Sequence, residues 1–194
     1  LFTQFALLCC LGLPLSAHAQ SEFHLQQQTL ANPDNEPAPV HPVPSPRQLK
    51  WQETEFYAFF HYGMNTYTGL EWGNGDENEN RFAPTRVPNP EQWLQAAKDA
   101  GMRGGIAVIK HHDGFCLWPT ATTTHNATSS SNPNAKQTNI PRDFAEAARK
   151  LNMKYGFYIS PWDRNSALYG TDRYVKEVFL RQCLEAAQYG NDQF

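Results

Sequence analysis

The sequence predicts an α/β fold, the N-terminal portion of a (β/α)8-like TIM barrel. Three segments have the character of strands, at 55–65, 104–109 and 154–160, and a helical pattern follows each of them. Within the second, Ile106 to Ile109 is an apolar run without polar alternation, which is typical of a strand buried on both faces of a parallel sheet. Regular alternation of strands and helices favours right-handed crossovers. A doubly wound sheet begins in the same way, but no G-x-G-x-x-G follows the first strand, which disfavours a nucleotide-binding fold.

Capping residues and helical spacing place the helices between these strands. Asn89 and Pro90 are a preferred cap and first residue, so we expect a helix from Pro90 to Gly101. Two more are expected over 142–151 and over 172–188, the latter capped by Thr171. The side chains expected on the buried faces are Trp93, Ala96, Ala97 and Ala100 in the first helix, Phe144, Ala148 and Leu151 in the second, and Val175, Phe179, Cys183 and Ala186 in the third.

The N-terminal part of the chain differs in composition from the rest. Residues 1–19 have the apolar core and the small-x-small ending, Ala17-His18-Ala19, of a signal peptide. Residues 20–48 are rich in Pro and Gln and predict a linker or an N-terminal arm, because they cannot bury a core of their own. The ordered domain is expected over 49–194. We therefore expect an exported protein, periplasmic or extracellular, without membrane contact once the signal is removed.

Overall composition excludes some functions and leaves others open. The formal net charge of −3 gives no electrostatic footprint for binding nucleic acid. Only Cys116 and Cys183 remain after the signal segment, so no disulfide framework is expected. Aromatic residues make up 13% of the chain, which suits a groove that stacks on flat ligand faces and suits a large core equally well.

Polar and aromatic residues collect where the predicted strands end. His61 ends the first, Lys110-His111-His112-Asp113 follow the second, and Trp162-Asp163 follow the third. In α/β folds this edge of the sheet is where ligands bind. Imidazoles and carboxylates there are costly to desolvate unless they contact polar groups. The sequence therefore predicts a binding site at the carboxyl ends of the strands.

Five motifs give this pattern a family resemblance. In order they read F-F-H-Y-G-M-N, E-W-G-N-G, F-A-P-T, K-H-H-D-G-F-C-L-W-P-T and Y-I-S-P-W-D-R-N. Together they resemble the retaining α-L-fucosidases, and the resemblance covers about residues 49–194. The S-P-W-D-R-N form is similar to the branch that acts on α-1,3/1,4-linked fucose. A fucosylated oligosaccharide or glycoconjugate is the implied partner, and no cofactor is implied.

The resemblance also implies roles for individual residues. It implies that histidines hold sugar hydroxyls, that a carboxylate and an indole grip the fucose, and that a tyrosine and a second tryptophan complete the pocket. The family's nucleophilic aspartate and its acid/base residue are expected after Phe194, so the chain, ending where a fourth strand begins, is expected to be inactive and poorly stable alone. The implied substrate-binding residues are His61, Glu71, Trp72, His111, His112, Tyr158 and Trp162.

Two alternatives remain open from the residues alone. One is a non-catalytic sugar-binding homologue. The other is a metal-dependent hydrolase that uses His111, His112 and Asp113. Adjacent histidines on a strand are expected to point to opposite faces, which disfavours a metal site, and Asp113 is expected to serve in a turn or to orient an imidazole.

Two further expectations concern residues around the site. Cys116 is expected to be a small buried hydrophobe. Asp163, Arg164 and Asn165 are expected to form a network that fixes their loop.

Overall fold

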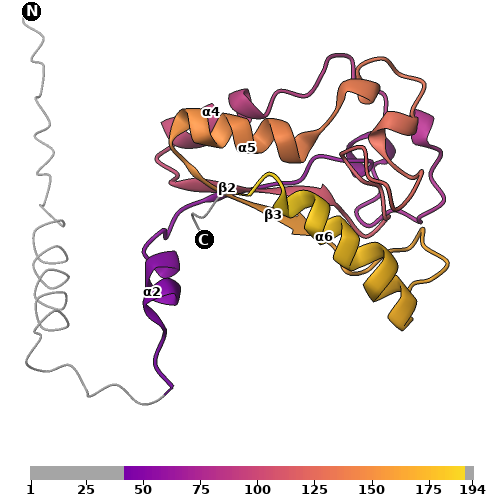
Figure 1. The fold of residues 1–194 in the computed structure, drawn as a ribbon. Helices are drawn as coiled ribbons and strands as arrows, with labels where there is room; N and C mark the ends of the chain where they lie inside the picture. Colours follow the sequence, from indigo (N-terminus) through magenta and orange to yellow (C-terminus); the bar gives the residue numbers. More distant parts are fainter. Residues whose placement is uncertain (1–41, 191–194) are drawn as a thin grey trace, which may run out of the picture. The chain divides into compact units, whose positions relative to one another are not determined.

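The computed structural model describes residues 42–190 (Figure 1). The chain divides into two compact units, Leu1–Pro44 and Ser45–Phe194, and the account below concerns the second. The predicted signal peptide lies outside the described residues, as does most of the predicted arm. Helix α2 (Pro46–Gln52) begins within the segment expected to be an arm. Its start is fixed by Ser45, whose hydroxyl accepts from the Gln48 amide while the Gln48 side chain accepts from the Ser45 amide.

Three parallel strands form the sheet. They are β1 (Ala58–Phe60), β2 (Gly104–Lys110) and β3 (Lys154–Ile159), in the order β1-β2-β3. Ala58 pairs with Gly105 of the central strand, and Gly104 pairs with Lys154 on its other side. The α/β class and the parallel sheet are therefore confirmed. Because both neighbours of β2 run in its own direction, all three strands end at the same edge of the sheet.

The first strand is much shorter than predicted. Only Ala58–Phe60 pair with β2, whereas the aromatic run had suggested a strand from Glu55 to Asn65. At one end Glu55 has a positive φ of 52°, so the extended chain cannot start there. At the other end the backbone turns into a short helix, α3 (Asn65–Thr68). The aromatic side chains beyond the strand pack ring against ring, as Tyr62 does on Tyr67 and Phe82.

Two helices cover one face of the sheet. They are α4 (Pro90–Asp99) and α5 (Ile140–Leu151), which lie side by side in Figure 1. Asn89 caps α4 as predicted, with its side chain accepting from the Gln92 amide. The face predicted for α4 is partly wrong, because Ala96 and Ala100 are exposed and Leu94 is buried. Leu94 is buried because Gly105 of β2 has no side chain. Leu94, Phe60 and Phe144 fill the space that a Cβ on Gly105 would take.

The third helix is irregular. A π-helical turn, η5 (Tyr174–Phe179), leads directly into α6 (Leu180–Ala187). The predicted cap is confirmed, because the Thr171 hydroxyl accepts from the Tyr174 amide. The predicted buried stripe is wrong at Val175, which is 53% exposed. Ala186 is buried as predicted, and Phe179 and Cys183 are partly buried. The other buried positions are Tyr174, Val178 and Gln182.

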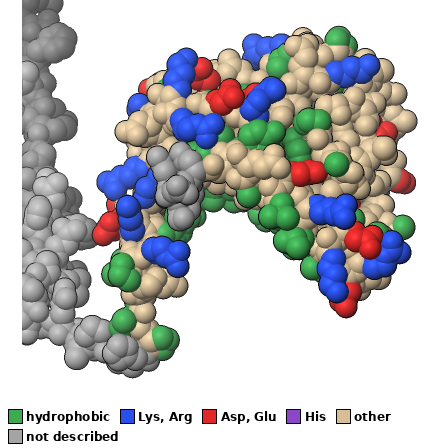
Figure 2. Space-filling view, in the orientation of Figure 1, with side chains coloured by type: hydrophobic (Ala, Val, Ile, Leu, Met, Phe, Trp, Pro, Cys, Tyr) green, Lys and Arg blue, Asp and Glu red, His purple; other side chains and the backbone are tan. Residues whose placement is uncertain are grey.

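Apolar side chains remain exposed beside the sheet and on the last helix. Along the outer edge of β3 a cavity of about 400 Å³ is lined by Phe157, Ile159 and Ala186, among others. Figure 2 shows hydrophobic side chains gathered along the lower edge of the unit that holds the sheet, in this view. Apolar faces of this kind are typical of surfaces that pack against another part of a protein. Within residues 42–190, no helix combines the length and the apolar character that crossing a bilayer requires. The exposed large apolar residues of this unit are Leu49, Trp51, Phe56, Tyr57, Phe59, Leu70, Trp72, Tyr169, Val175, Leu180 and Leu184.

Candidate active site

Six of the seven predicted site residues meet in one aromatic cluster at the carboxyl edge of the sheet. The ring centroids of His61 and His111 are 5.6 Å apart, and those of His111 and His112 are 4.1 Å apart. Trp162 continues the series at 4.9 Å from His112. The aromatic cluster comprises His61, Trp72, His111, His112, Tyr158 and Trp162. Each of the three strand ends therefore contributes at least one ring.

The two adjacent histidines lie side by side, so the prediction that they point to opposite faces is wrong. Their ring planes are inclined by only 37°. The reason is that β2 ends at Lys110, after a break in the pairing register between Val108 and Lys110. His112 therefore stands in a turn and does not follow strand alternation.

His111 is held neutral by its surroundings. Burial, followed by the neighbouring charges of His112 and His61, lowers its pKa to about 4. Its Nδ1 atom is buried without a hydrogen-bond partner among the described residues. Leaving a polar nitrogen unpaired costs free energy, which a polar ligand or an ordered water molecule would offset. A neutral imidazole can donate from one nitrogen and accept at the other, as binding a hydroxyl requires.

His112 is fixed by the end of the third strand. Its Nδ1 atom lies 2.7 Å from the hydroxyl of Ser160, which in turn donates to the carbonyl of Trp162 at 2.9 Å. Burial, then the charges of Arg164 and His61, lower the pKa of His112. The lowered pKa favours the neutral ring, and the hydrogen bond to Ser160 holds it close to Trp162.

The loop that carries Glu71 and Trp72 is pinned to the segment after β3. Arg164 donates from Nη1 to the carbonyl of Gly73 at 2.6 Å, and Asn165 donates from Nδ2 to that of Gly75 at 2.7 Å. The predicted loop-fixing role of these residues is thus confirmed, and it extends to a second loop.

The pinned loop presents its two site residues differently. Trp72 is 50% exposed, with its ring 6.2 Å from that of His112. Glu71 is exposed beside it and outside the ring contacts, and its main-chain carbonyl accepts from Asn65. An exposed indole face at the edge of the aromatic cluster is suited to the apolar face of a sugar.

Asp113 serves in a turn, which is one of the two roles predicted for it. Its Oδ1 atom accepts from the amide of Phe115 at 2.8 Å, and its Oδ2 atom is buried with no partner among residues 42–190. Burial raises the pKa of this carboxyl to about 6, against the opposing hydrogen bond from Phe115. In the described part of the chain, no three His, Cys, Asp or Glu side chains are grouped as metal ligands. The arrangement therefore gives no support to a metal site built on His111, His112 and Asp113.

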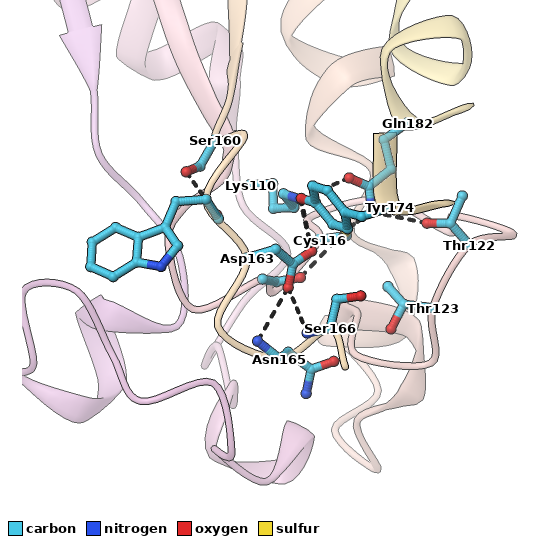
Figure 3. A network of polar contacts seen from close by, with 12 residues as sticks. Lys110, Cys116, Thr122, Thr123, Ser160, Asp163, Asn165, Ser166, Tyr174 and Gln182 are labelled. Atoms are coloured by element: carbon cyan, nitrogen blue, oxygen red, sulfur yellow. Dashed lines mark hydrogen bonds and ion pairs between the residues drawn. The ribbon is translucent and has the colours of Figure 1, made fainter. Parts of the chain in front are cut away.

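Sequence reasoning missed a buried polar network around Lys110, the residue before His111 (Figure 3). Lys110 has no exposed surface, and its Nζ atom donates to Asp163 at 2.9 Å, to Tyr174 at 3.0 Å and to Gln182 at 2.9 Å. Gln182 also donates to Thr122. The only signal in the sequence was a lysine at the end of an apolar strand, because its partners are distant along the chain.

Cys116 lies at the edge of the same network. The residue is fully buried, as predicted, and burial raises the pKa of its thiol far above the usual range. Its sulfur accepts a weak hydrogen bond from Gln182 at 3.6 Å. The thiol is therefore a packed, unreactive group.

Comparison with known proteins identifies the family. The family model described as Alpha-L-fucosidase matches residues 47–189. Alpha-L-fucosidase 1 of Arabidopsis thaliana is 41% identical over 155 residues, which are 79% of this chain and 30% of that protein. Tissue alpha-L-fucosidase of Homo sapiens is 28% identical, covering 63% of this chain and 31% of its own. The chain thus spans about a third of the length of these relatives.

Solved structures agree with this assignment. A glycoside hydrolase 29 family member from an unknown rumen bacterium superposes with a TM-score of 0.73 at 44% identity, covering 79% of this chain and 27% of that one. The GH29 fucosidase of Ruminococcus gnavus, solved in complex with fucose, has a TM-score of 0.60 at 34% identity over 70% of this chain and 28% of its own. The chain described here belongs to the alpha-L-fucosidase family.

Proposed function

We propose that this chain is the first part of the (β/α)8 barrel of a retaining exo-α-L-fucosidase, and that the aromatic cluster is its fucose-binding surface. One observation carries the proposal: three successive strand ends bring His61, His111 and Trp162 into a single series of rings. In a barrel, residues from the ends of several strands build one site at this edge. The structural relative from Ruminococcus gnavus, solved with fucose, supports the choice of sugar.

The chemistry of the aromatic cluster suits a deoxy sugar. Neutral imidazoles can each donate and accept one hydrogen bond, which matches hydroxyl groups that do both. The half-exposed indole of Trp72 can cover an apolar sugar face and a methyl group. Glu71 beside it can accept charge-assisted bonds from hydroxyls.

Two carboxylates that stand next to cluster residues in the chain, Asp113 and Asp163, make structural contacts. Asp163 is bound to Lys110, and Asp113 is buried and caps the Phe115 amide. Retaining hydrolysis needs one carboxylate as nucleophile and a second carboxyl as acid and base, roughly 5 Å apart. In line with the family resemblance, we propose that both catalytic groups lie after Phe194. No metal or organic cofactor is part of this proposal.

The substrate is proposed to be terminal fucose on an oligosaccharide or glycoconjugate. Linkage through α-1,3 or α-1,4 bonds is supported by the S-P-W-D-R-N segment, in which Trp162 stands at the rim of the aromatic cluster. Export is proposed from the composition of residues 1–19. N-terminal sequencing of the protein from its host tests that part, with Gln20 as the expected first residue.

The proposed activity is tested in the full-length polypeptide that carries this chain. We expect it to hydrolyse an aryl α-L-fucoside in preference to other aryl glycosides. His61→Ala and His112→Ala should each lower kcat/KM by about 1–3 kcal/mol, roughly ten- to hundred-fold, because hydroxyl contacts are lost in the transition state.

A histidine outside the aromatic cluster provides the control. His125 is buried and bound to Glu79, so His125→Ala should lower stability while kcat/KM of the folded protein stays within about threefold of wild type. Unchanged kinetics in both cluster variants would remove the histidines from the site. Fucose binding without hydrolysis would indicate a non-catalytic homologue, and loss of activity with a chelator would indicate a metal enzyme.

A further inference from the structure

We propose that the buried Lys110–Asp163 ion pair is a positioning unit. It holds the side chains of His111 and His112 in a fixed position relative to Trp162. The inference rests on the proposed function for its meaning, since the rings it positions are the proposed fucose-binding groups. Neither Lys110 nor Asp163 is among the site residues predicted from the sequence. Both stand next to cluster residues in the chain, Lys110 before His111 and Asp163 after Trp162.

Lys110 has its full complement of hydrogen bonds. An ammonium group has three protons to donate, and Nζ has three acceptors at 2.9 to 3.0 Å, supplied by Asp163, Tyr174 and Gln182. The acceptors come from the segment after β3 and from the last helix (Figure 3). The side chain of Lys110 therefore joins the end of β2 to two other parts of the fold.

Asp163 uses its second oxygen to shape the loop that presents Trp162. Oδ1 accepts from the amides of Asn165 at 3.2 Å and Ser166 at 2.9 Å, while Oδ2 is bound to Lys110. One carboxylate thus links the cation to the turn itself. A displacement of Lys110 would be transmitted to the backbone next to Trp162.

Main-chain bonds tie the same two segments together. The amide of Ser160 donates to the carbonyl of Lys110 at 3.0 Å, and the amide of Arg164 donates to that of His112 at 2.9 Å. These bonds bracket the histidine pair. Together, these main-chain bonds and the Lys110–Asp163 ion pair fix His111 and His112 relative to Trp162.

The last helix has an irregular backbone at the point where its side chains reach the ammonium group of Lys110. The π-helical turn Tyr174–Phe179 departs from the ordinary α-helical register, and such turns often occur at functional sites. Tyr174 and Gln182 both face inward and both reach the same ammonium group. Two polar side chains thus occupy a helix face that would otherwise carry apolar residues.

Stability alone does not account for a charged pair in this place. Removing two charges from water is costly, and well-packed apolar residues of similar size are often as stable or more stable. What a charged, fully hydrogen-bonded pair adds is a defined geometry. The geometry in question is that of the strand end from which the histidines project.

The experiment compares three variants of the full-length polypeptide at a temperature at which all are folded. The double variant Lys110→Met/Asp163→Asn removes both charges while nearly keeping side-chain volume, so no buried charge is left unpaired. Tyr174→Phe removes one hydroxyl, which accepts from Lys110 and donates to Asp163 at 3.3 Å, and leaves the ion pair itself in place. Phe144→Leu is the control, because Phe144 packs in the core against Phe60 and Phe157 and should affect stability alone.

We expect the double variant to lose about tenfold or more in kcat/KM for an aryl α-L-fucoside, with a similar rise in the Kd for fucose. Tyr174→Phe should lose roughly threefold. Phe144→Leu should stay within about twofold of wild type although its unfolding temperature falls. The inference is overturned if the double variant stays within about twofold of wild type, or if Phe144→Leu loses as much as the double variant.

A second measurement does not depend on fucose. Diethylpyrocarbonate modifies accessible imidazoles, and peptide mapping reports its rate for the His111–His112 segment. The double variant should be modified faster than wild type there, and Phe144→Leu should not. If the wild-type protein neither binds fucose nor cleaves fucosides, the proposed function is wrong. An unchanged modification rate in the double variant would instead show that the ion pair does not position the histidines.

Discussion

The hydroxyl of Ser160 sets the tautomer of His112. Ser160 lies 2.7 Å from Nδ1 of the imidazole and donates to the carbonyl of Trp162 at 2.9 Å. A hydroxyl has one proton, and the carbonyl can only accept, so the bond to the imidazole is donated by His112 Nδ1–H. The neutral ring therefore carries its lone pair on Nε2, which makes it an acceptor for a ligand hydroxyl.

We predict that Ser160→Ala lowers kcat/KM for an aryl α-L-fucoside by about three- to tenfold. The substitution frees the His112 ring to rotate and to change tautomer, which costs roughly one hydrogen bond of net free energy. Steady-state kinetics of the full-length polypeptide measure the effect.

Ser130→Ala is the matched control for this prediction. Ser130 is another fully buried serine, and its hydroxyl donates to the carbonyl of Phe82 and accepts from Asn132. The control should lose stability and retain its kinetics. Equal losses of activity in Ser160→Ala and Ser130→Ala would show that the Ser160–His112 bond has no special role.

The order of elements could be predicted because it depends on local signals. Apolar runs marked β2 and β3, and the caps Asn89 and Thr171 marked helix starts. The faces of the helices were harder to predict, since a pattern of apolar residues treats Gln182 as a surface residue. In the fold Gln182 is fully buried because it binds Lys110.

The site was predictable one strand end at a time. A parallel sheet brings the carboxyl ends of its strands together, so His61, His111 and Trp162 could be assigned to one edge. Their mutual geometry could not, because it depends on where β2 leaves the sheet. The buried network was beyond prediction, since the partners of Lys110 lie 53, 64 and 72 residues away.

His111 and Asp113, which are separated by one residue in the sequence, should affect stability in opposite directions as pH changes. The pKa of His111 is lowered to about 4, so between that value and the unfolded pKa near 6.5 the unfolded state binds more protons, and stability is lost as pH falls. The pKa of Asp113 is raised to about 6, so the folded state binds the extra proton. Its contribution is present at low pH and is lost as pH rises towards 6.

Asp113→Asn should therefore remove one of these opposing dependences. The asparagine can still accept from the Phe115 amide, but it does not titrate. We expect the free energy of unfolding of the variant, minus that of wild type, to be higher at pH 7 than at pH 4 by roughly 2 kcal/mol. Urea unfolding at both pH values measures it. The neighbouring ionisable groups Glu77, His125 and Asp163 are common to both proteins, and a pH-independent difference would contradict the burial of Asp113.

Gly75 should be far less replaceable than Gly69, although both have a positive φ, of 90° and 70° respectively. A Cβ on Gly75 would collide with the main chain of Arg164, whereas a Cβ on Gly69 would meet nothing within 4 Å. Both alanine variants suffer the strain of the left-handed region, about 1 kcal/mol. Gly75→Ala should lose at least about 2 kcal/mol more, because the pinned loop must move.

The Gly75 substitution should also affect the site, since that loop carries Trp72. We expect weaker fucose binding in Gly75→Ala than in Gly69→Ala, measured by calorimetry on the full-length polypeptide. If both variants bind fucose equally well, then Trp72 does not need the pinned loop in order to contact the sugar.

The exposed apolar face of the last helix should behave differently in short and long forms of the protein. Val175, Leu180 and Leu184 are 53%, 50% and 58% exposed, and in a continued barrel this face would pack against the next unit. Leu184→Lys should therefore reduce aggregation and dye binding of the 194-residue chain, because it breaks an apolar patch. In the full-length polypeptide the same change should lower the unfolding temperature, because burying an unpaired charge and losing a buried leucine each cost free energy, about 2 kcal/mol for the leucine alone. Gln188→Lys is the control, because it changes an exposed polar position of the same segment, and it should change neither property. An unaltered unfolding temperature for full-length Leu184→Lys would show that nothing packs on this face.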